Sequence, residues 1–137
     1  MARDWALKIL YQTDITARDL PKIAEAFWAE EKNQDAEIRE FCKRIIYGVY
    51  ENLKAIDEKI SKYATNWQLK RMAIIDRNIL RLGVFELQYA PDIPPKVTIN
   101  EAVELAKRYG DLESSKFVNG ILDKIHKTEF LSQSEKV

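Results

Sequence analysis

The stretch PPKVTINEAVELAKRYGDLESSKFVNGILD, residues 94–123, predicts two consecutive helices separated by a short turn. Pro94 and Pro95 cannot continue a helix, because proline lacks the backbone N–H donor and has a fixed φ. The four residues from Thr98 to Glu101 then have the form of a capping box, in which the two end side chains bond each other's backbone N–H groups. We therefore expect a helix to begin there.

The turn that follows also carries helix signals. Gly110 can supply the left-handed residue that ends the first helix, and Ser114 or Ser115 can cap a second helix that begins at Lys116. Gly120 lies inside that second helix, where a glycine costs about 1 kcal/mol relative to alanine. The close approach of another helix would account for it. Caps of this kind occur in any all-α protein, so they indicate the fold class alone.

Helical periodicity runs through most of the chain, and no segment alternates like a strand. We expect an all-α fold, a single compact bundle of about six to seven helices. The expected helices cover residues 2–14, 21–28, 38–60 with a bend near 54, 71–89, 99–109 and 116–127, with Asn33 and Asp35 as caps of the third. The helix over 71–89 is apolar on nearly every face, which predicts a central, buried position.

Length and charge limit the class of protein. The 137 residues fit one domain, expected to span 1–128, with a polar tail over 129–137 and fraying from Thr128. Lys plus Arg equals Asp plus Glu at 22 each, so the net charge is about zero. Proteins that hold nucleic acid by bulk charge usually show a basic excess. Any such contact in this chain must be a local patch.

Several other classes of protein are disfavoured. No apolar run approaches the roughly 20 residues of a membrane span, and charged residues interrupt the N-terminal segment, unlike a signal peptide. Cys42 is the single cysteine, so neither an internal disulfide nor a Cys-rich zinc site is expected. The only histidine, His126, is expected to be solvated. Without metal-ligand spacing, a phosphate loop or a nucleophile motif, we expect a cytoplasmic protein with no enzymatic activity, metal or cofactor.

Five blocks of sequence together resemble the NusB family of bacterial transcription antitermination factors. They are ALKILYQTD (6–14), FCKRIIYGVYENLKAID (41–57), DRNILRLGVFEL (76–87), INEAVELAK (99–107) and SKFVNGILD (115–123). The resemblance implies an all-helical RNA-binding factor. It would pair with the ribosomal protein NusE, bind the single-stranded boxA element of nascent transcripts, and join the elongation complex through the Nus factors.

The resemblance also implies which residues meet RNA. An aromatic ring beside a cation suits an unstacked base next to a phosphate, and Lys116 with Phe117 lies at the family's RNA-binding edge. A purely hydrophobic core role for Phe117 remains the alternative, as capping does for Ser114, whose hydroxyl could meet phosphate. The family's arginine-rich N-terminal arm is represented by Arg3 and Lys8. Because each lost phosphate contact lowers affinity, weaker independent RNA binding is expected.

For the protein partner, the resemblance points to Tyr11, Tyr63 and Asp76. An aromatic ring with a hydroxyl tip makes a suitable interface anchor, and an exposed carboxylate suits a basic ribosomal protein. The alternative for Asp76 is an ion pair within its helix, with Arg77 or Arg81. The alternative for the two tyrosines is partial burial against neighbouring helices.

Other residues of the motifs are expected to serve the structure. Asn100 and Asn119 are expected to be buried hydrogen-bonding residues that hold loops in place, beside the structural Glu101 and Gly120. Glu113 would face RNA unfavourably and tune the affinity.

Two further interpretations stay open. The same helical domain occurs as the N-terminal module of ribosomal-RNA cytosine methyltransferases, although this chain ends near residue 137 without a cofactor domain. A helical scaffold that binds proteins, in the form of a homodimer and with little RNA binding, would agree with the zero net charge.

Overall fold

The computed structural model describes residues 1–64 and 69–130, and within them the fold is all-α, as predicted. Seven α-helices and two short helical segments make up this part of the chain. The α-helices are α1 (Ala2–Thr16), α2 (Leu20–Glu30), α3 (Ala36–Glu51), α4 (Leu53–Tyr63), α5 (Ile74–Tyr89), α6 (Pro95–Tyr109) and α7 (Ser114–Ile125); the short segments are Leu69–Arg71 and His126–Phe130.

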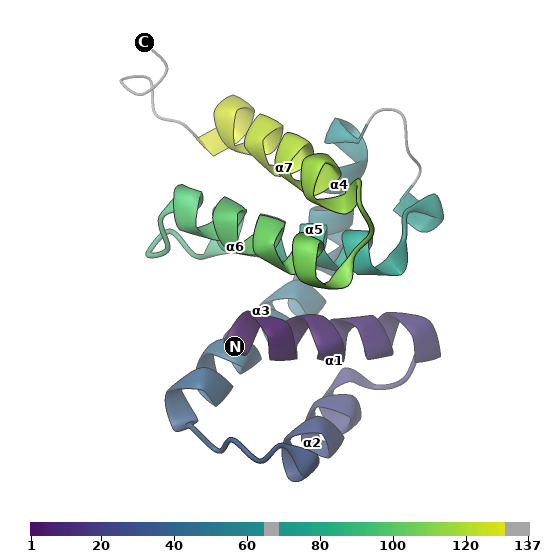
Figure 1. Ribbon diagram of the computed structural model, residues 1–137, viewed down its shortest axis with the longest axis vertical. Coiled ribbons are helices and arrows are strands. Elements are labelled where there is room, and N and C mark those ends of the chain that lie inside the picture. Colours follow the sequence, from purple (N-terminus) through teal and green to yellow (C-terminus); the bar gives the residue numbers. More distant parts are fainter. Residues whose placement is uncertain (65–68, 131–137) are drawn as a thin grey trace.

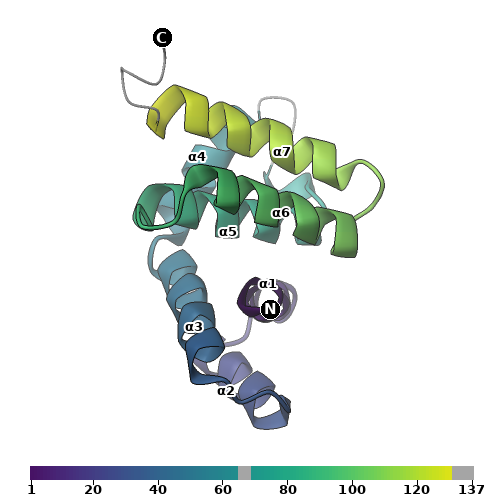
Figure 2. The ribbon, with the colours of Figure 1, turned by 60° about the vertical axis from the view of Figure 1, so that its left-hand side comes forward.

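Helix α5 lies at the centre of the bundle, as its nearly continuous apolar surface predicts. It packs against α1, α3, α4, α6 and α7. Figure 2 shows α1 almost end-on beside α3, with α2 at the far end of that pair, while α6 lies in front of α5 and α7 lies beyond them, away from α1. The long amphipathic stretch predicted over 38–60 is divided at Asn52 into α3 and α4.

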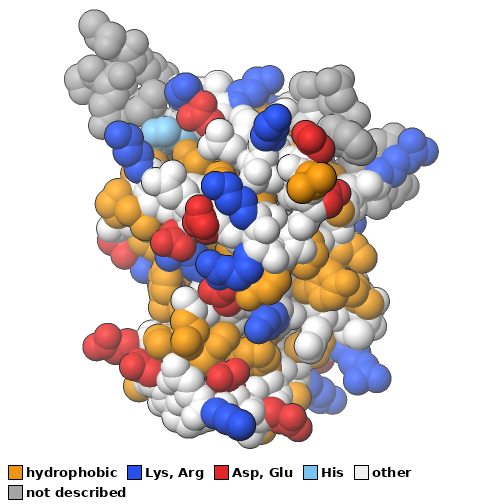
Figure 3. All heavy atoms as spheres, viewed as in Figure 1, with side chains coloured by type: hydrophobic (Ala, Val, Ile, Leu, Met, Phe, Trp, Pro, Cys, Tyr) orange, Lys and Arg blue, Asp and Glu red, His pale blue; other side chains and the backbone are white. Residues whose placement is uncertain are grey.

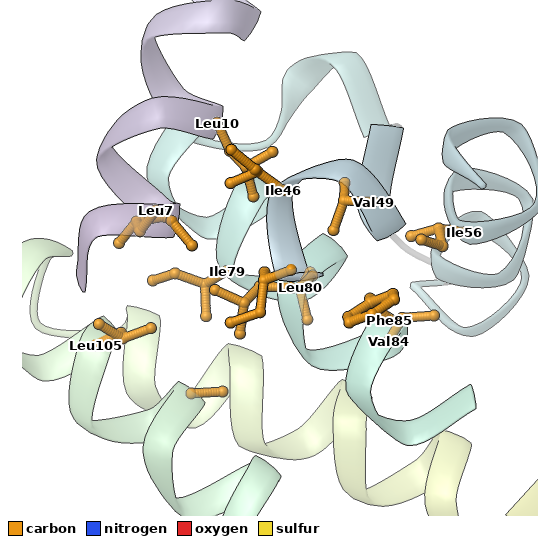
Figure 4. Close-up of a cluster of buried hydrophobic side chains, with 14 of the residues drawn as sticks. Leu7, Leu10, Ile46, Val49, Ile56, Ile79, Leu80, Val84, Phe85 and Leu105 are labelled. Carbon is orange, nitrogen blue, oxygen red and sulfur yellow. The ribbon is translucent and has the colours of Figure 1, made fainter. Parts of the chain in front are cut away.

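The core is assembled from helices that are far apart in the sequence. Leu7 of α1, Ile46 of α3, Ile79 and Leu80 of α5, and Leu105 of α6 meet in it (Figure 4) and are at most 2% exposed. Burying one such side chain stabilises the fold by about 1.5–3 kcal/mol relative to leaving it in water. The core therefore joins the α1–α3 part of the molecule to the α4–α7 part (Figure 1).

A buried carboxylate ties three helices together. Glu86 of α5 is 1% exposed and accepts two hydrogen bonds from the Arg3 guanidinium, both at 2.8 Å. The Thr98 hydroxyl of α6 donates a third bond to Glu86 Oε1 at 2.9 Å. Burial opposes the charge of Arg3, yet the hydrogen bonds and negative charge of Glu86 leave the Arg3 pKa raised. The Arg3 guanidinium also lies over the Phe41 ring, 5.1 Å from its centroid.

A second polar network joins α1 and α4 to α5. The Asp14 carboxylate receives hydrogen bonds from Arg77, Asn78 and Arg81, each at 2.9 Å. Arg81 also holds Asp57 of α4 through two bonds, at 2.8 and 3.0 Å. Although burial acts to raise the pKa of Asp14, the bonds from Asn78 and Arg77 and the two arginine charges lower it overall.

The capping box predicted from Thr98 to Glu101 is wrong. Helix α6 already begins at Pro95. Thr98 is fully buried in its first turn, where its hydroxyl donates a hydrogen bond to Glu86. Glu101 is exposed, and its negative charge helps to raise the pKa of Arg3. The Thr98 hydroxyl therefore bonds Glu86, a residue of another helix, and does not cap its own helix as the local sequence pattern predicted.

The predicted left-handed Gly110 is also wrong, since its φ is −94°. Glycine is required there by space: a Cβ atom would lie 2.4 Å from Ser114 Oγ and 2.8 Å from the Ala106 carbonyl oxygen. Ser114 is the first residue of α7 and not its cap, and Lys116 is its third. The N-cap position is Glu113, which makes no side-chain cap bond, and Asp111 Oδ1 accepts the backbone N–H groups of Glu113 and Ser114 at 3.0 and 3.1 Å.

Three residues expected to be structural lie on the surface. Asn100 of α6 and Asn119 of α7 are exposed, so the prediction that they are buried hydrogen-bonding residues is wrong. Gly120 is exposed as well, and a Cβ atom placed on it would have no neighbour within 4 Å. The predicted close approach of another helix at Gly120 is therefore also wrong among the described residues.

The segment His126–Phe130 packs against α4. Glu129 forms an ion pair with Lys59 and accepts a hydrogen bond from the Tyr63 hydroxyl. The pKa of Glu129 is lowered, first by its bond from Lys59 and then by that from Tyr63. The predicted fraying from Thr128 is thus not met over 128–130, and the rest of the predicted tail lies outside the described residues.

We predict that Arg3→Ala destabilises the protein by about 3–5 kcal/mol, because it leaves the Glu86 carboxylate buried without its cation. The double variant Arg3→Met/Glu86→Leu should recover most of this loss, since it removes both charges together. Urea unfolding of the three proteins measures the effect. A loss below ~1 kcal/mol for Arg3→Ala, as for an exposed ion pair, would contradict the role assigned to Glu86.

Candidate functional site

Three adjoining hollows form one trough along an edge of the molecule. They have volumes of about 170, 450 and 630 Å³. The middle hollow shares Tyr11, Ile75 and Tyr109 with the smallest, and Asp76 and Ser114 with the largest. In Figure 1 this edge is on the right, where the middle of α1, the start of α5, the end of α6 and the start of α7 converge. Figure 3 shows hydrophobic side chains gathered on that side.

The trough brings together most of the residues that the sequence assigned to RNA or partner contact. Six of them line it: Lys8, Tyr11, Asp76, Ser114, Lys116 and Phe117. They come from three helices that are widely separated in the chain. Sequence blocks assigned to RNA contact and to partner contact therefore lie on one continuous surface.

Arg3 and Tyr63 lie elsewhere. The Arg3 guanidinium is engaged by the buried Glu86, and the Arg3 side chain is only 15% exposed. It is thus neither the solvated helix-end charge nor the free phosphate ligand that the sequence suggested. Tyr63 is 7% exposed and its hydroxyl bonds Glu129, so partial burial describes it better than an interface position.

Aromatic rings are spread along the trough. Tyr11 and Tyr109 lie at one end and Phe117 lies at the other. The Tyr109 hydroxyl donates a 2.9 Å hydrogen bond to Asp4, which also pairs with Arg108. Sequence reasoning missed Tyr109, because its place in the trough depends on α1 packing beside the end of α6. Its ring and that of Phe117 offer apolar faces of the kind on which bases stack.

The middle of the trough is acidic. Asp76, in the first turn of α5, is 8% exposed, and its Oδ1 atom has no hydrogen-bond partner among the described residues. Burial raises the pKa of Asp76, the Ser114 hydroxyl opposes this shift, and the charge of Asp111 adds to it. The predicted alternative, an ion pair with Arg77 or Arg81, is wrong, since both arginines bond carboxylates on other helices.

The start of α7 is held by a reciprocal pair of side chains. The Ser114 hydroxyl donates to Asp111 Oδ1 at 3.2 Å and accepts the Asp111 backbone N–H at 3.0 Å. This pair holds the loop between α6 and α7, so that Lys116 and Phe117 follow a turn fixed by side-chain hydrogen bonds. Lys116 is exposed and Phe117 is partly buried against the core, which agrees in part with the core interpretation of that ring. Glu113 lines the same hollow, as an acidic neighbour of Lys116.

Other chemistry finds no support in the described part of the chain. No group of three His, Cys, Asp or Glu side chains is placed there to hold a metal ion. Cys42 is fully buried, which raises the pKa of its thiol to about 12. His126 is partly buried, contrary to the solvated position expected for it. None of the described helices is long and apolar enough to cross a membrane.

Comparisons with known proteins point to one family. The model of the NusB family matches residues 1–127. The chain is 48% identical over 126 residues to a transcription antitermination protein NusB of Myxococcus xanthus, with 90% of each chain covered. It is 47% identical to the NusB of Sorangium cellulosum, covering 90% of this chain and 87% of that one. It spans 57% of a longer NusB from Chloroherpeton thalassium, at 46% identity.

Solved structures agree with this assignment. The NusB of T. maritima superimposes with a TM-score of 0.88 at 42% identity, over 99% of this chain and 95% of that one. A structure of antitermination factors NusB and NusE in complex with double-stranded RNA matches with a TM-score of 0.85 at 30% identity, covering 92% and 93%.

We predict that Asp76→Asn raises the melting temperature at pH 7. The folded pKa of Asp76 is raised above its ordinary value of 3.8, so the folded protein binds this proton more tightly than the unfolded chain does. The stability that the neutral Asp76 carboxyl contributes is therefore fully present below its ordinary pKa of 3.8 and is lost as the pH rises through its raised pKa in the folded protein.

Thermal unfolding from pH 7 down to pH 4 measures this effect. The advantage of Asp76→Asn should shrink as the pH falls, because the raised pKa of the wild-type carboxyl increasingly favours its neutral form. A variant that melts lower than the wild type by the same amount at both pH values would contradict the account.

Proposed function

This chain belongs to the NusB family, and we propose that it acts as a transcription antitermination factor that binds boxA-type RNA of nascent transcripts together with the ribosomal protein NusE. In this role it is a cytoplasmic adaptor without enzymatic activity. Its relatives carry the name of antitermination proteins, and a related structure contains NusB, NusE and RNA. These names favour the adaptor over a module of a methyltransferase.

The trough is the observation that carries the proposal. Its ends carry the exposed cations Lys8 and Lys116, its middle carries Asp76 and Asp111, and Glu113 lies at the same end as Lys116. Phosphates favour the cationic ends, while an acidic centre favours the Lys and Arg side chains of a basic protein. One surface of mixed charge can thus accept an RNA strand and a basic ribosomal protein next to each other.

We assign two parts of the trough to different partners. The RNA end is the start of α7, where Phe117 offers a ring to an unstacked base and Lys116 a charge to the adjacent phosphate. The NusE site is formed by Tyr11 of α1 and, in the middle of the trough, by Asp76 of α5, whose Oδ1 atom has no bonding partner among the described residues and can accept a guanidinium or ammonium group.

Binding as a pair explains how a chain of zero net charge holds RNA. With Arg3 bound to Glu86, the short N-terminal arm offers Lys8 but no free arginine to phosphate, so the affinity of this chain alone is expected to be low. NusE, once bound at the trough, supplies further contacts to the same strand. The two weak surfaces then act on one RNA and gain affinity through effective concentration.

We predict that Phe117→Ala weakens binding of a labelled boxA-type RNA by about 1–3 kcal/mol, the usual contribution of one base stacked on an aromatic ring. Lys116→Glu should also weaken binding, because it replaces a phosphate contact by a repulsive charge. Fluorescence anisotropy in the presence of NusE measures both effects.

The controls are Tyr50→Ala and Lys54→Glu, which alter an exposed ring and an exposed cation outside the trough. Circular dichroism must show that the helices are retained. If the four variants bind RNA equally well, the assignment of the RNA end is wrong. If Phe117→Ala loses its helices, the core role of that ring is the correct one.

We predict that Asp76→Asn weakens NusE binding roughly tenfold, since an amide removes the negative charge that attracts a cationic side chain. Isothermal titration calorimetry with NusE measures the change. The same variant is expected to be more stable at pH 7, so unfolding cannot account for the loss. Unchanged affinity for NusE would remove Asp76 from the interface.

A further inference from the structure

Gly120 is the residue of the KFVNG motif that packing leaves unexplained. It lies in the interior of α7, where glycine lowers helix stability relative to alanine. It is exposed, and a Cβ atom would meet no atom of the described residues within 4 Å. Its φ is not positive, so the backbone conformation does not require glycine either. The remaining physical reason for a bare backbone is the close approach of a ligand.

The surroundings of Gly120 indicate the charge of that ligand. Residues three and four apart are neighbours on a helix surface, so Lys116 and Lys124 flank Gly120 on one stripe of α7. Both lysines are exposed, and neither forms an ion pair among the described residues. Glu113 is an acidic neighbour of Lys116, while Asp123, beside Lys124, is paired with Lys127 at 2.9 Å. The stripe therefore presents two free cations about 12 Å apart along the helix axis.

This stripe is continuous with the trough. Phe117, which lines the largest hollow, lies three residues before Gly120 and so beside it on the helix. Helix α6 packs against α7 and carries Lys107 and Arg108 in its last turn. Figure 3 shows Lys and Arg side chains spread over the face of α6 and α7, among several carboxylates.

We propose that the outer stripe of α7, Lys116–Gly120–Lys124, is a track for the sugar–phosphate backbone of the RNA as it leaves the base bound at Phe117. The missing side chain at Gly120 lets the strand lie against the helix, so that the two lysines reach successive phosphates. This inference rests on the proposed RNA-binding function and extends the RNA site along α7, beyond Lys116 and Phe117.

The glycine permits a test in which stability and binding move in opposite directions. Gly120→Ala should raise the melting temperature by about 2–5 °C, because alanine favours the helix. The same variant should bind a fluorescein-labelled single-stranded boxA-type RNA, with NusE present, about threefold to tenfold more weakly. Gly120→Leu should bind still more weakly, because the larger side chain holds the strand further from the lysines.

Ser61→Ala is the matched control, since Ser61 is an exposed position inside α4. It should be at least as stable as the wild type and bind RNA normally. Unchanged RNA affinity in both Gly120 variants would overturn the proposal.

The second lysine of the track, Lys124, is tested through the dependence of binding on salt. Lys124→Gln should reduce the slope of log affinity against log salt concentration by about 0.7, the value for one phosphate contact with a single strand. Lys54→Gln on α4 should leave the slope unchanged. If Lys124 only stabilises the end of α7, its variant will melt lower while the slope stays the same, and the proposal fails.

Phe117→Ala distinguishes failure of the track from failure of the proposed RNA site as a whole. Weaker RNA binding for Phe117→Ala with wild-type binding for Gly120→Ala and Gly120→Leu would preserve the proposed function and reject the track. Wild-type binding for Phe117→Ala as well would reject the RNA site itself. A loss of NusE binding in the Gly120 variants, with RNA binding of the variants alone unchanged, would assign the stripe to the protein partner and reject the track.

Discussion

The buried polar side chains of α5 are the constraint on which the rest of the structure depends. An apolar helix at the centre of a bundle could rotate or slide with little change in buried area, but polar groups removed from water require specific partners. Glu86 requires Arg3 of α1 and Thr98 of α6, while Arg81 requires Asp57 of α4. Because each bond comes from a different neighbour, α5 sets both the position and the register of the helices around it.

That arrangement also creates the trough. The start of α5 places Asp76 where α1, the end of α6 and the start of α7 meet. Since α1 is held at both ends, through Arg3 and Asp14, Tyr11 between them faces the trough from a fixed position. The residues that maintain the fold and those that line the trough are thus neighbours on the same helices. Substitutions that disturb one set are expected to affect the other.

Local patterns in the sequence predicted the helices and the central position of α5, because both can be inferred from the spacing of apolar residues along a short stretch of chain. They failed where the partner is distant. Thr98 looks like a cap until Glu86 is placed beside it, and Arg3 looks like a free arm residue because Glu86 lies 83 positions away. The six trough residues were found through the family resemblance, whereas Tyr109 belongs to the trough only once α1 is packed. Both glycine predictions were wrong. Gly110 was expected to be left-handed but is required by crowding, and Gly120 was expected to be crowded but has open space around it among the described residues.

The central claim is that one continuous trough, with its extension along α7, receives both RNA and NusE. Amide chemical-shift mapping of the isotope-labelled protein tests it most directly, with boxA-type RNA and NusE added separately and then together. The account predicts RNA-induced shifts along α7 from Lys116 to Lys124. It predicts NusE-induced shifts in the middle of α1 around Tyr11 and at the start of α5 around Asp76. Shifts confined to the opposite part of the molecule, on α2 and α3 around Trp28 and Lys43, would contradict it.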